Sequence, residues 1–140
     1  MNLQVAVLCD AATDYNGKLS LLGAFDTIIG SEFPLVHRHC ALALRMSFAN
    51  FEEGTRTLEL RIVDEDGTQV IKPVSAELDI RVPGNGLFAT RNIILNFEGL
   101  KFSSPGQYSI DLYLDGTLAA GIALQILKVN RPATPSPEAN

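Results

Sequence analysis

The chain contains two histidines separated by one residue, His37 and His39. This residue type and spacing are used in metal-binding sites. Alternate side chains of a strand point to the same side, so both imidazoles could face one ion. The positions that follow, Leu42, Ala43 and Leu44, supply no third ligand. Because a metal site needs three or four ligands, the spacing favours a loop histidine followed by a strand-start histidine.

Two aspartates extend this group. Asp10 and Asp26 lie near the first expected hairpin, and loops at one end of the fold could bring them to His37 and His39. The sequence therefore leaves open a metal or small-ligand site built from these four residues. The acidic run 64–67 could also suggest calcium ligands, but an Asp-Gly hairpin turn explains it without a metal.

Catalytic signatures are missing from the sequence. It contains no Gly-x-Ser-x-Gly elbow and no phosphate-binding glycine loop before a helix, and nothing pairs a nucleophile with a base. We therefore expect a protein that is not an enzyme and needs no cofactor. Cys9 and Cys40 each share a strand face with apolar residues, so we expect two buried free thiols that act as small hydrophobic side chains.

Composition narrows the class of partner. The 140 residues carry 11 basic and 16 acidic side chains, for a net charge of −5, and no Lys/Arg cluster. A nucleic-acid partner is therefore not expected. No apolar run reaches the roughly 20 residues of a membrane helix, and the N-terminus lacks the features of a signal peptide. We expect a cytoplasmic protein with one domain over residues 1–129 and a disordered, Pro-rich tail over 130–140.

Apolar and polar residues alternate with a period of two in four stretches, residues 58–62, 74–82, 93–97 and 108–115. This alternation is typical of strands with one buried and one wet face. Adding less regular segments, the expected strands cover residues 2–10, 18–29, 39–48, 56–63, 68–71, 74–82, 92–98, 107–114 and 117–129. The sequence predicts an all-β fold, a two-layer antiparallel β-sandwich of eight or nine strands that is immunoglobulin-like or jelly-roll-like.

Three local features refine this prediction. Gly23 lies inside an expected strand, where glycine indicates a bulge or bend. Asp115 and Gly116 form a hairpin-turn pair between the last two strands. Tyr108 follows Gly106 at a strand start, which resembles the tyrosine corner of immunoglobulin-like sandwiches, in which the hydroxyl bonds to nearby backbone.

Some strand positions expected to be polar are small and apolar. They are Ala41 and Ala43 on the third strand, and Ala119, Gly121 and Ala123 on the last strand. An exposed apolar sheet face indicates a partner, so these five residues are candidates for contact with another protein or with a second copy. The alternative is that loops of this chain, residues 30–36 or 84–90, cover them.

The combination of segments resembles an uncharacterised bacterial family of small all-β proteins, a domain of unknown function. The segments that carry the resemblance are residues 7–10, 17–26, Phe33-Pro34 with His37, 60–67, 106–108 and Asp115-Gly116. The resemblance implies one intact all-β domain and no catalytic residues. The leading expectation is a non-enzymatic binding or self-assembling module that uses the small apolar face, and the second is a ligand or metal site at the loop end.

Overall fold

The computed structural model describes residues 1–130 and contains nine strands and one short 3₁₀ turn, which confirms the all-β class. The elements are β1 (Asn2–Tyr15), β2 (Lys18–Phe25), β3 (Thr27–Gly30), β4 (Leu35–Ala49), η1 (Asn50–Glu52), β5 (Gly54–Val63), β6 (Val74–Ile80), β7 (Phe88–Phe102), β8 (Gly106–Leu114) and β9 (Thr117–Lys128). The tail prediction falls almost entirely outside the described residues. Within residues 1–130, no helix has the length and apolarity needed to cross a membrane.

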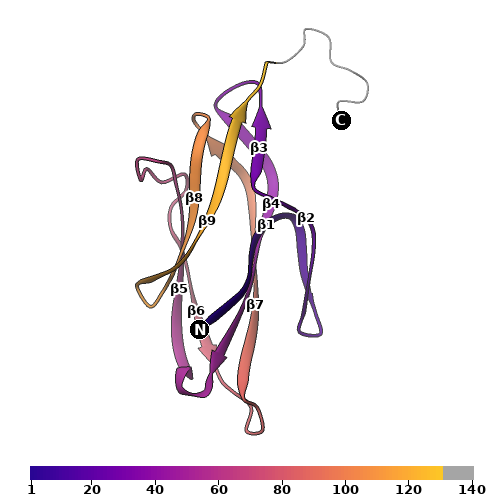
Figure 1. The fold of residues 1–140 in the computed structure, drawn as a ribbon, viewed down its shortest axis with the longest axis vertical. Helices are drawn as coiled ribbons and strands as arrows, with labels where there is room; N and C mark the ends of the chain where they lie inside the picture. Colours follow the sequence, from indigo (N-terminus) through magenta and orange to yellow (C-terminus); the bar gives the residue numbers. More distant parts are fainter. Residues whose placement is uncertain (131–140) are drawn as a thin grey trace.

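The strands form two sheets (Figure 1). Sheet A has the order β2-β1-β4-β7, and sheet B has the order β3-β9-β8-β5-β6. All neighbouring strands are antiparallel except β3 and β9, which run parallel. The expectation of an entirely antiparallel fold is therefore wrong at this pair. Only Asp26 separates β2 at the edge of sheet A from β3 at the edge of sheet B, so the chain changes sheets there without forming a hairpin.

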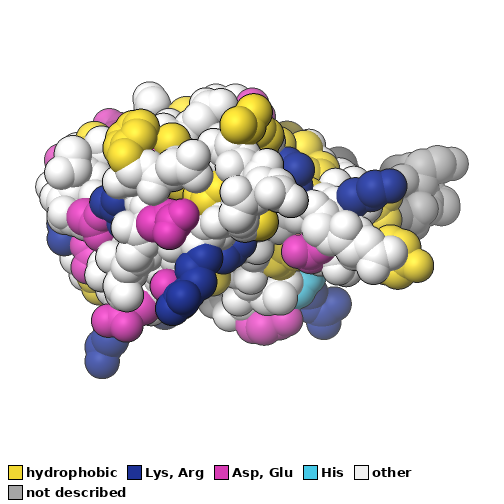
Figure 2. Space-filling model, turned by 90° about the horizontal axis from the view of Figure 1, so that it is seen from below, with side chains coloured by type: hydrophobic (Ala, Val, Ile, Leu, Met, Phe, Trp, Pro, Cys, Tyr) yellow, Lys and Arg dark blue, Asp and Glu magenta, His cyan; other side chains and the backbone are white. Residues whose placement is uncertain are grey.

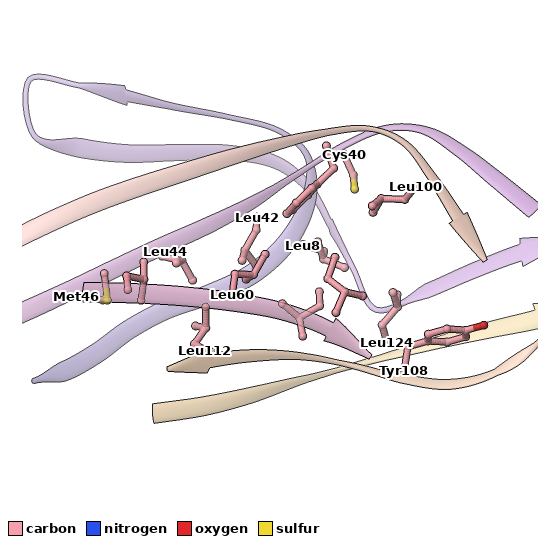
Figure 3. Packing of buried hydrophobic residues seen from close by; sticks show 14 of the residues in the cluster. Leu8, Cys40, Leu42, Leu44, Met46, Leu60, Leu100, Tyr108, Leu112 and Leu124 are labelled. Atoms are coloured by element: carbon pink, nitrogen blue, oxygen red, sulfur yellow. The ribbon is translucent and has the colours of Figure 1, made fainter. Parts of the chain in front are cut away.

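The main core lies between the two sheets (Figure 3). Sheet A contributes Leu8, Leu42, Leu44 and Phe102, and sheet B contributes Leu60, Ile110, Leu112 and Ile126, all almost fully buried. The predicted alternation produces this core because each strand turns every second side chain inward. Tyr108 closes one end of the core, and its hydroxyl donates to the Ser104 carbonyl oxygen at 2.6 Å, which confirms the predicted tyrosine corner.

Strand β1 is longer than predicted because it belongs to two pairings. Its first half pairs with β4, and its second half pairs with β2. Between them, Asp10 lies across from Gly23, whose φ is +68°. A positive φ is a conformation that glycine adopts without strain, and a Cβ on Gly23 would also force the Asp10 side chain to move. The predicted irregularity is therefore present as a positive φ within β2, while the register of the β1–β2 pairing stays unbroken.

The β1–β2 hairpin folds back over the side of sheet A that faces away from sheet B (Figure 1). At its tip, the Gly17 carbonyl oxygen accepts hydrogen bonds from Arg45 Nη1 and Asn92 Nδ2, both at 3.1 Å. Arg45 on β4 and Asn92 on β7 are directly paired across sheet A. Two side chains of sheet A thus hold the tip of the hairpin.

A second, smaller core lies beneath this hairpin. Cys9, Ala41 and Ala43 are fully buried, and the side chains packed around them are Val7, Ala12, Leu19, Leu21 and Ile94. The expectation that Ala41 and Ala43 form part of an exposed face is therefore wrong. The chain covers them itself, with the β1–β2 hairpin and not with the loops at residues 30–36 or 84–90. Their small size allows the hairpin to lie close to the sheet.

The strand expected over residues 68–71 is also wrong. The structure has only an isolated bridge there, between Val63 and Gln69. Asp64 Oδ1 accepts hydrogen bonds from the backbone amides of Asp66 and Thr68, both at 2.9 Å, which holds this segment as a wide turn. Pro73 follows before β6 begins and cannot donate to a sheet.

Candidate functional site

The two histidines of the His-x-His pair have different surroundings. His37 pairs with Leu100 of β7, a core residue, whereas His39 pairs with the exposed Glu98. Between these two positions of β7, Gly99 has a φ of +67°, and the inward and outward positions exchange there. His39 Nδ1 lies 2.7 Å from Glu98 Oε1 in an exposed pair. The spacing therefore does not direct both imidazoles toward one ion, because the strand alternation is broken at this point.

The four residues of the expected loop-end site are divided among three places. Asp10 and His37 line one hollow of about 440 Å³, and Asp26 lines a different one. His39 is held by Glu98. Among the described residues, no group of three or more His, Cys, Asp or Glu side chains is placed to hold a metal ion.

His37 is nevertheless unusual. Its Nε2 atom is buried and has no hydrogen-bond partner within the part of the chain that the structure describes. The ring packs against Phe25, with the two ring centroids 5.6 Å apart. A buried polar atom without a partner is rare in native proteins and costs stability. The same hollow is lined by Asp10 and by the apolar residues Phe25 and Ile28. It could accept a small molecule that satisfies Nε2.

The acidic side chains of the turn at residues 64–67 accept hydrogen bonds from backbone amides. Beyond the Asp64 bonds, Glu65 Oε1 accepts from the backbone amide of Gln107 at 2.9 Å and ties the turn to the start of β8. These oxygens are therefore already used, and turn chemistry explains the run, as the sequence predicted.

Both cysteines are free and buried, as expected. Burial raises the pKa of the Cys40 thiol to about 11, and it also raises the pKa of the Cys9 thiol. A thiol that stays protonated is a poor nucleophile and a poor metal ligand. The Cys9 Sγ donates to the Ala41 carbonyl oxygen at 3.6 Å beneath the hairpin. The arrangement is that of two packing residues.

The five candidate interface residues lie on two different sheets. Ala41 and Ala43 are the buried pair beneath the hairpin, while Ala119, Gly121 and Ala123 are exposed on β9 of sheet B. The sequence analysis grouped these five residues because a period-two pattern shows which residues share one face of a strand. The pattern does not show which sheet the strand belongs to. Only the β9 group remains available as a contact surface, which we call the β9 surface (Ala119, Gly121 and Ala123).

The two ends of the β9 surface have different surroundings. Gly121 lies beside the hydrogen-bonded pair Ser109 Oγ and Asp111 Oδ1, which are 2.6 Å apart, and a Cβ there would be tightly placed against both atoms. Ala123 lines an open hollow of about 550 Å³, together with Gln107, Gln125, Asp26 and Lys128. The surface therefore offers backbone, small side chains and one concave region.

The edge of β9 is a feature that sequence reasoning missed. Strand β3 pairs with residues 125–128 of β9, and no described strand pairs with residues 117–124 on that side. The run from Thr117 to Leu127 contains no charged residue. That missing charge was visible in the sequence, but the edge position was not, because it depends on which strands are neighbours.

The face seen from below has a mixed composition. Seen from below, acidic and basic side chains are interspersed, and hydrophobic side chains gather in separate groups between them (Figure 2). Small groups of exposed apolar side chains are common on protein surfaces.

Comparison of the chain with known proteins identifies its family but gives no information about its function. No curated protein matches the chain. Among solved structures, the alkylpurine DNA glycosylase AlkC of Pseudomonas fluorescens, bound to DNA containing an abasic site analog, is similar with 12% identity and a TM-score of 0.46. The match covers 74% of this chain and 28% of that chain. A likeness at this level carries no argument about function.

A family model covers almost all of the described chain. It matches residues 4–127 and is described as a family of unknown function, DUF6941. The match agrees with the resemblance found in the sequence and with a small, nearly all-β structure. The chain therefore belongs to this family of unknown function, DUF6941.

Proposed function

We propose that this protein is a non-enzymatic binding module that recognises another protein chain through the β9 surface. The observation that carries the proposal is the exposure of Ala119, Gly121 and Ala123 in the uncharged run 117–127 of β9, whose outer edge has no described neighbour over residues 117–124. Exposed, uncharged strand edges are usually protected in proteins that remain monomeric. The presence of such an edge in this protein supports a role in binding a partner. Ala41 and Ala43 are no longer part of the proposal.

The test is a charge placed on this surface. Ala123→Glu puts a carboxylate on the exposed side of β9, where it should abolish binding to a protein partner without affecting folding. Ser75→Glu, at an exposed position of β6, is the matched control. A partner captured from the host is identified, purified and titrated against all three proteins.

A loss of affinity in Ala123→Glu alone supports the proposal. Equal affinity for all three proteins overturns it. Circular dichroism and melting temperature show whether each variant is folded, so that a binding loss caused by unfolding is recognised.

We further propose that the scaffold is an immunoglobulin-like two-layer β-sandwich in the cytoplasm. The Tyr108 corner and the core between the two sheets support the architecture. The two free thiols support a reducing compartment. An experimental structure and fractionation of the host cell test the two parts separately.

A second candidate function is small-ligand binding in the hollow lined by Asp10 and His37. The unpaired Nε2 atom of His37 favours it, because a ligand could supply the missing hydrogen bond. A compound from a small-molecule library that occupies this hollow should raise the melting temperature of the wild type but not of His37→Phe. His39→Phe, which alters the exposed histidine, should respond like the wild type. An equal response in all three proteins removes this candidate.

A further inference from the structure

The polar backbone groups of β9 are open to a partner over one short stretch. The Gln125 amide donates to the Asp26 carbonyl oxygen at 2.9 Å, on the side of β9 where β3 lies. Because successive residues of a strand direct their amides and carbonyls to opposite sides, those of Gly121 and Ala123 face the same way as those of Gln125. Strand β3 begins its pairing only at Gln125, so the described part of the chain supplies no strand to receive them.

A carboxylate lies over this stretch. Gly121 is paired directly with Asp111 of the neighbouring strand β8. A Cβ built on Gly121 would lie 3.3 Å from Asp111 Oδ1, so the carboxylate leans toward β9, beside the space that a side chain at position 121 would fill. Ser109 Oγ donates to the same oxygen at 2.6 Å and holds it there. Because residue 121 is glycine, no side chain of β9 separates Asp111 from the open edge at this position.

Asp111 forms no ion pair with a cationic side chain of residues 1–130. Arg61 is its partner in the register of β5 and β8 and is the cation best placed to do so. The Arg61 guanidinium instead pairs with Glu59 at 2.8 Å and packs over the Tyr113 ring, 4.5 Å from the centroid. The Asp111 carboxylate is therefore half-buried and fixed in position, and the described chain does not neutralise it with a salt bridge.

We propose that an extended segment of another protein adds to β9 as a further strand of sheet B and places a Lys or Arg side chain opposite Gly121, against Asp111. This inference rests on the proposed function and names the chemistry of the partner. Residues paired across neighbouring strands point to the same face, so the side chain opposite Gly121 shares the face of Asp111 whichever way the added strand runs. The Cβ positions of such a pair are about 5 Å apart, a distance that a Lys or Arg side chain spans.

Two properties of the edge select this occupant. The free backbone groups of Gly121 and Ala123 select an extended chain, because an added strand satisfies alternate amides and carbonyls along an edge. The Asp111 carboxylate selects a cation on that strand, and the net charge of −5 attracts a basic partner. A second copy of this chain fits less well, since residues 117–127 of its β9 contain no cation to meet Asp111.

Peptide probes test the charge preference. Short peptides of alternating Thr and Val that carry Arg, Gln or Glu at the central position are titrated into isotope-labelled protein, and the Gly121 and Ala123 amide signals are followed by NMR. The Arg peptide should bind the wild type about two- to fivefold more tightly than the Gln peptide, which is the range for an exposed ion pair. The Glu peptide should bind more weakly than either.

Two variants separate the effect of Asp111 from that of the overall charge. Asp111→Asn keeps an oxygen for the Ser109 hydroxyl and removes the charge, so it should bind the Arg and Gln peptides equally. Glu77→Gln removes the same charge from β6, at the opposite edge of sheet B, and should keep the wild-type preference. The Gln peptide should bind all three proteins alike, which shows that the edge is intact in each.

Amide hydrogen exchange reports the added strand itself. The Arg peptide should slow exchange at Gly121 and Ala123, whose amides face the open edge, and should not change exchange at Leu124, whose amide points to β8. The inference is overturned if no peptide protects those two amides, if the peptides bind the wild type alike, or if Asp111→Asn keeps the preference for Arg. Protection that rises with protein concentration alone would identify a second copy as the occupant and would also overturn it.

These outcomes are separate from the test of the proposed function. Ala123→Glu should weaken a basic partner as well, because the added strand would exclude the water that the new carboxylate needs. The proposed function fails if Ala123→Glu leaves binding of the captured partner unchanged, whatever the peptides show.

Discussion

At the scale of single residues, Tyr108 has the most clearly defined role. Its ring is buried and lies edge-on to Phe102, with ring centroids 5.0 Å apart, and its hydroxyl reaches the Ser104 carbonyl oxygen. The bond links the loop before β8 to the strand itself. One side chain thus closes the end of the core and fixes the entry to sheet B.

Tyr108→Phe should lower the free energy of unfolding by about 1–2 kcal/mol, because the Ser104 carbonyl loses its partner in a partly buried setting. Urea denaturation measures the change. Tyr113→Phe is the control: Tyr113 lies on the same strand, but its ring packs under the Arg61 guanidinium, 4.5 Å from the centroid, and should keep that contact. Equal losses in the two variants would show that the hydroxyl at position 108 contributes nothing specific.

At the scale of elements, the β1–β2 hairpin covers the outer face of sheet A and is held to it at the hairpin tip. Glycine at position 23 adopts a positive φ without strain, and Arg45 holds the tip through the Gly17 carbonyl. Arg45 also donates to Gln4 Oε1 at 2.9 Å and to Asn92 Oδ1 at 2.8 Å. The small apolar residues beneath the hairpin supply its packing surface, so the outer face of sheet A is a second core.

Arg45→Met should loosen the hairpin while leaving the main core intact, because it removes the tip anchor and keeps an apolar stem of similar length. The Cys9 thiol lies beneath the hairpin and should react faster with a thiol reagent in this variant, whereas Cys40 in the main core should not. Mass spectrometry of labelled peptides separates the two sites. Arg38→Met, at an exposed position of the same strand, is the control and should label like the wild type.

At the scale of the whole molecule, folding brings the β8–β9 turn against the start of β5. The Asp115 carboxylate accepts from the Thr57 amide at 2.9 Å and from Arg56 Nη1 at 3.0 Å. These two contacts, the amide first, hold the pKa of the Asp115 carboxyl below its ordinary value of 3.8. Asp115 has a φ of +50°, a conformation that aspartate and asparagine tolerate better than most residues.

Stability should therefore fall in acid. A carboxyl whose pKa is lower in the folded state stabilises that state above its unfolded pKa, and the stabilisation disappears as the pH falls through the folded value. Asp115→Asn should make the free energy of unfolding less dependent on pH below about pH 4. Chemical denaturation at pH 2–6 measures the slope. Asp66→Asn removes the same charge at an exposed turn position and should keep the wild-type slope; matching slopes in the two variants would contradict the role of Asp115.

The sequence by itself determined those features that depend on neighbours along the chain. Alternation identified most of the strands, Gly23 and Asp115-Gly116 identified an irregularity within β2 and a turn, and Tyr108 identified the corner, because each expresses a local backbone or side-chain requirement. The tertiary structure alone decided which faces are covered. Ala41 and Ala123 look alike in sequence, yet one lies beneath the hairpin and the other is exposed. Distant segments of the chain determine whether a strand face is buried and whether a strand edge is left unpaired. A period-two pattern does not encode where those segments lie in the fold.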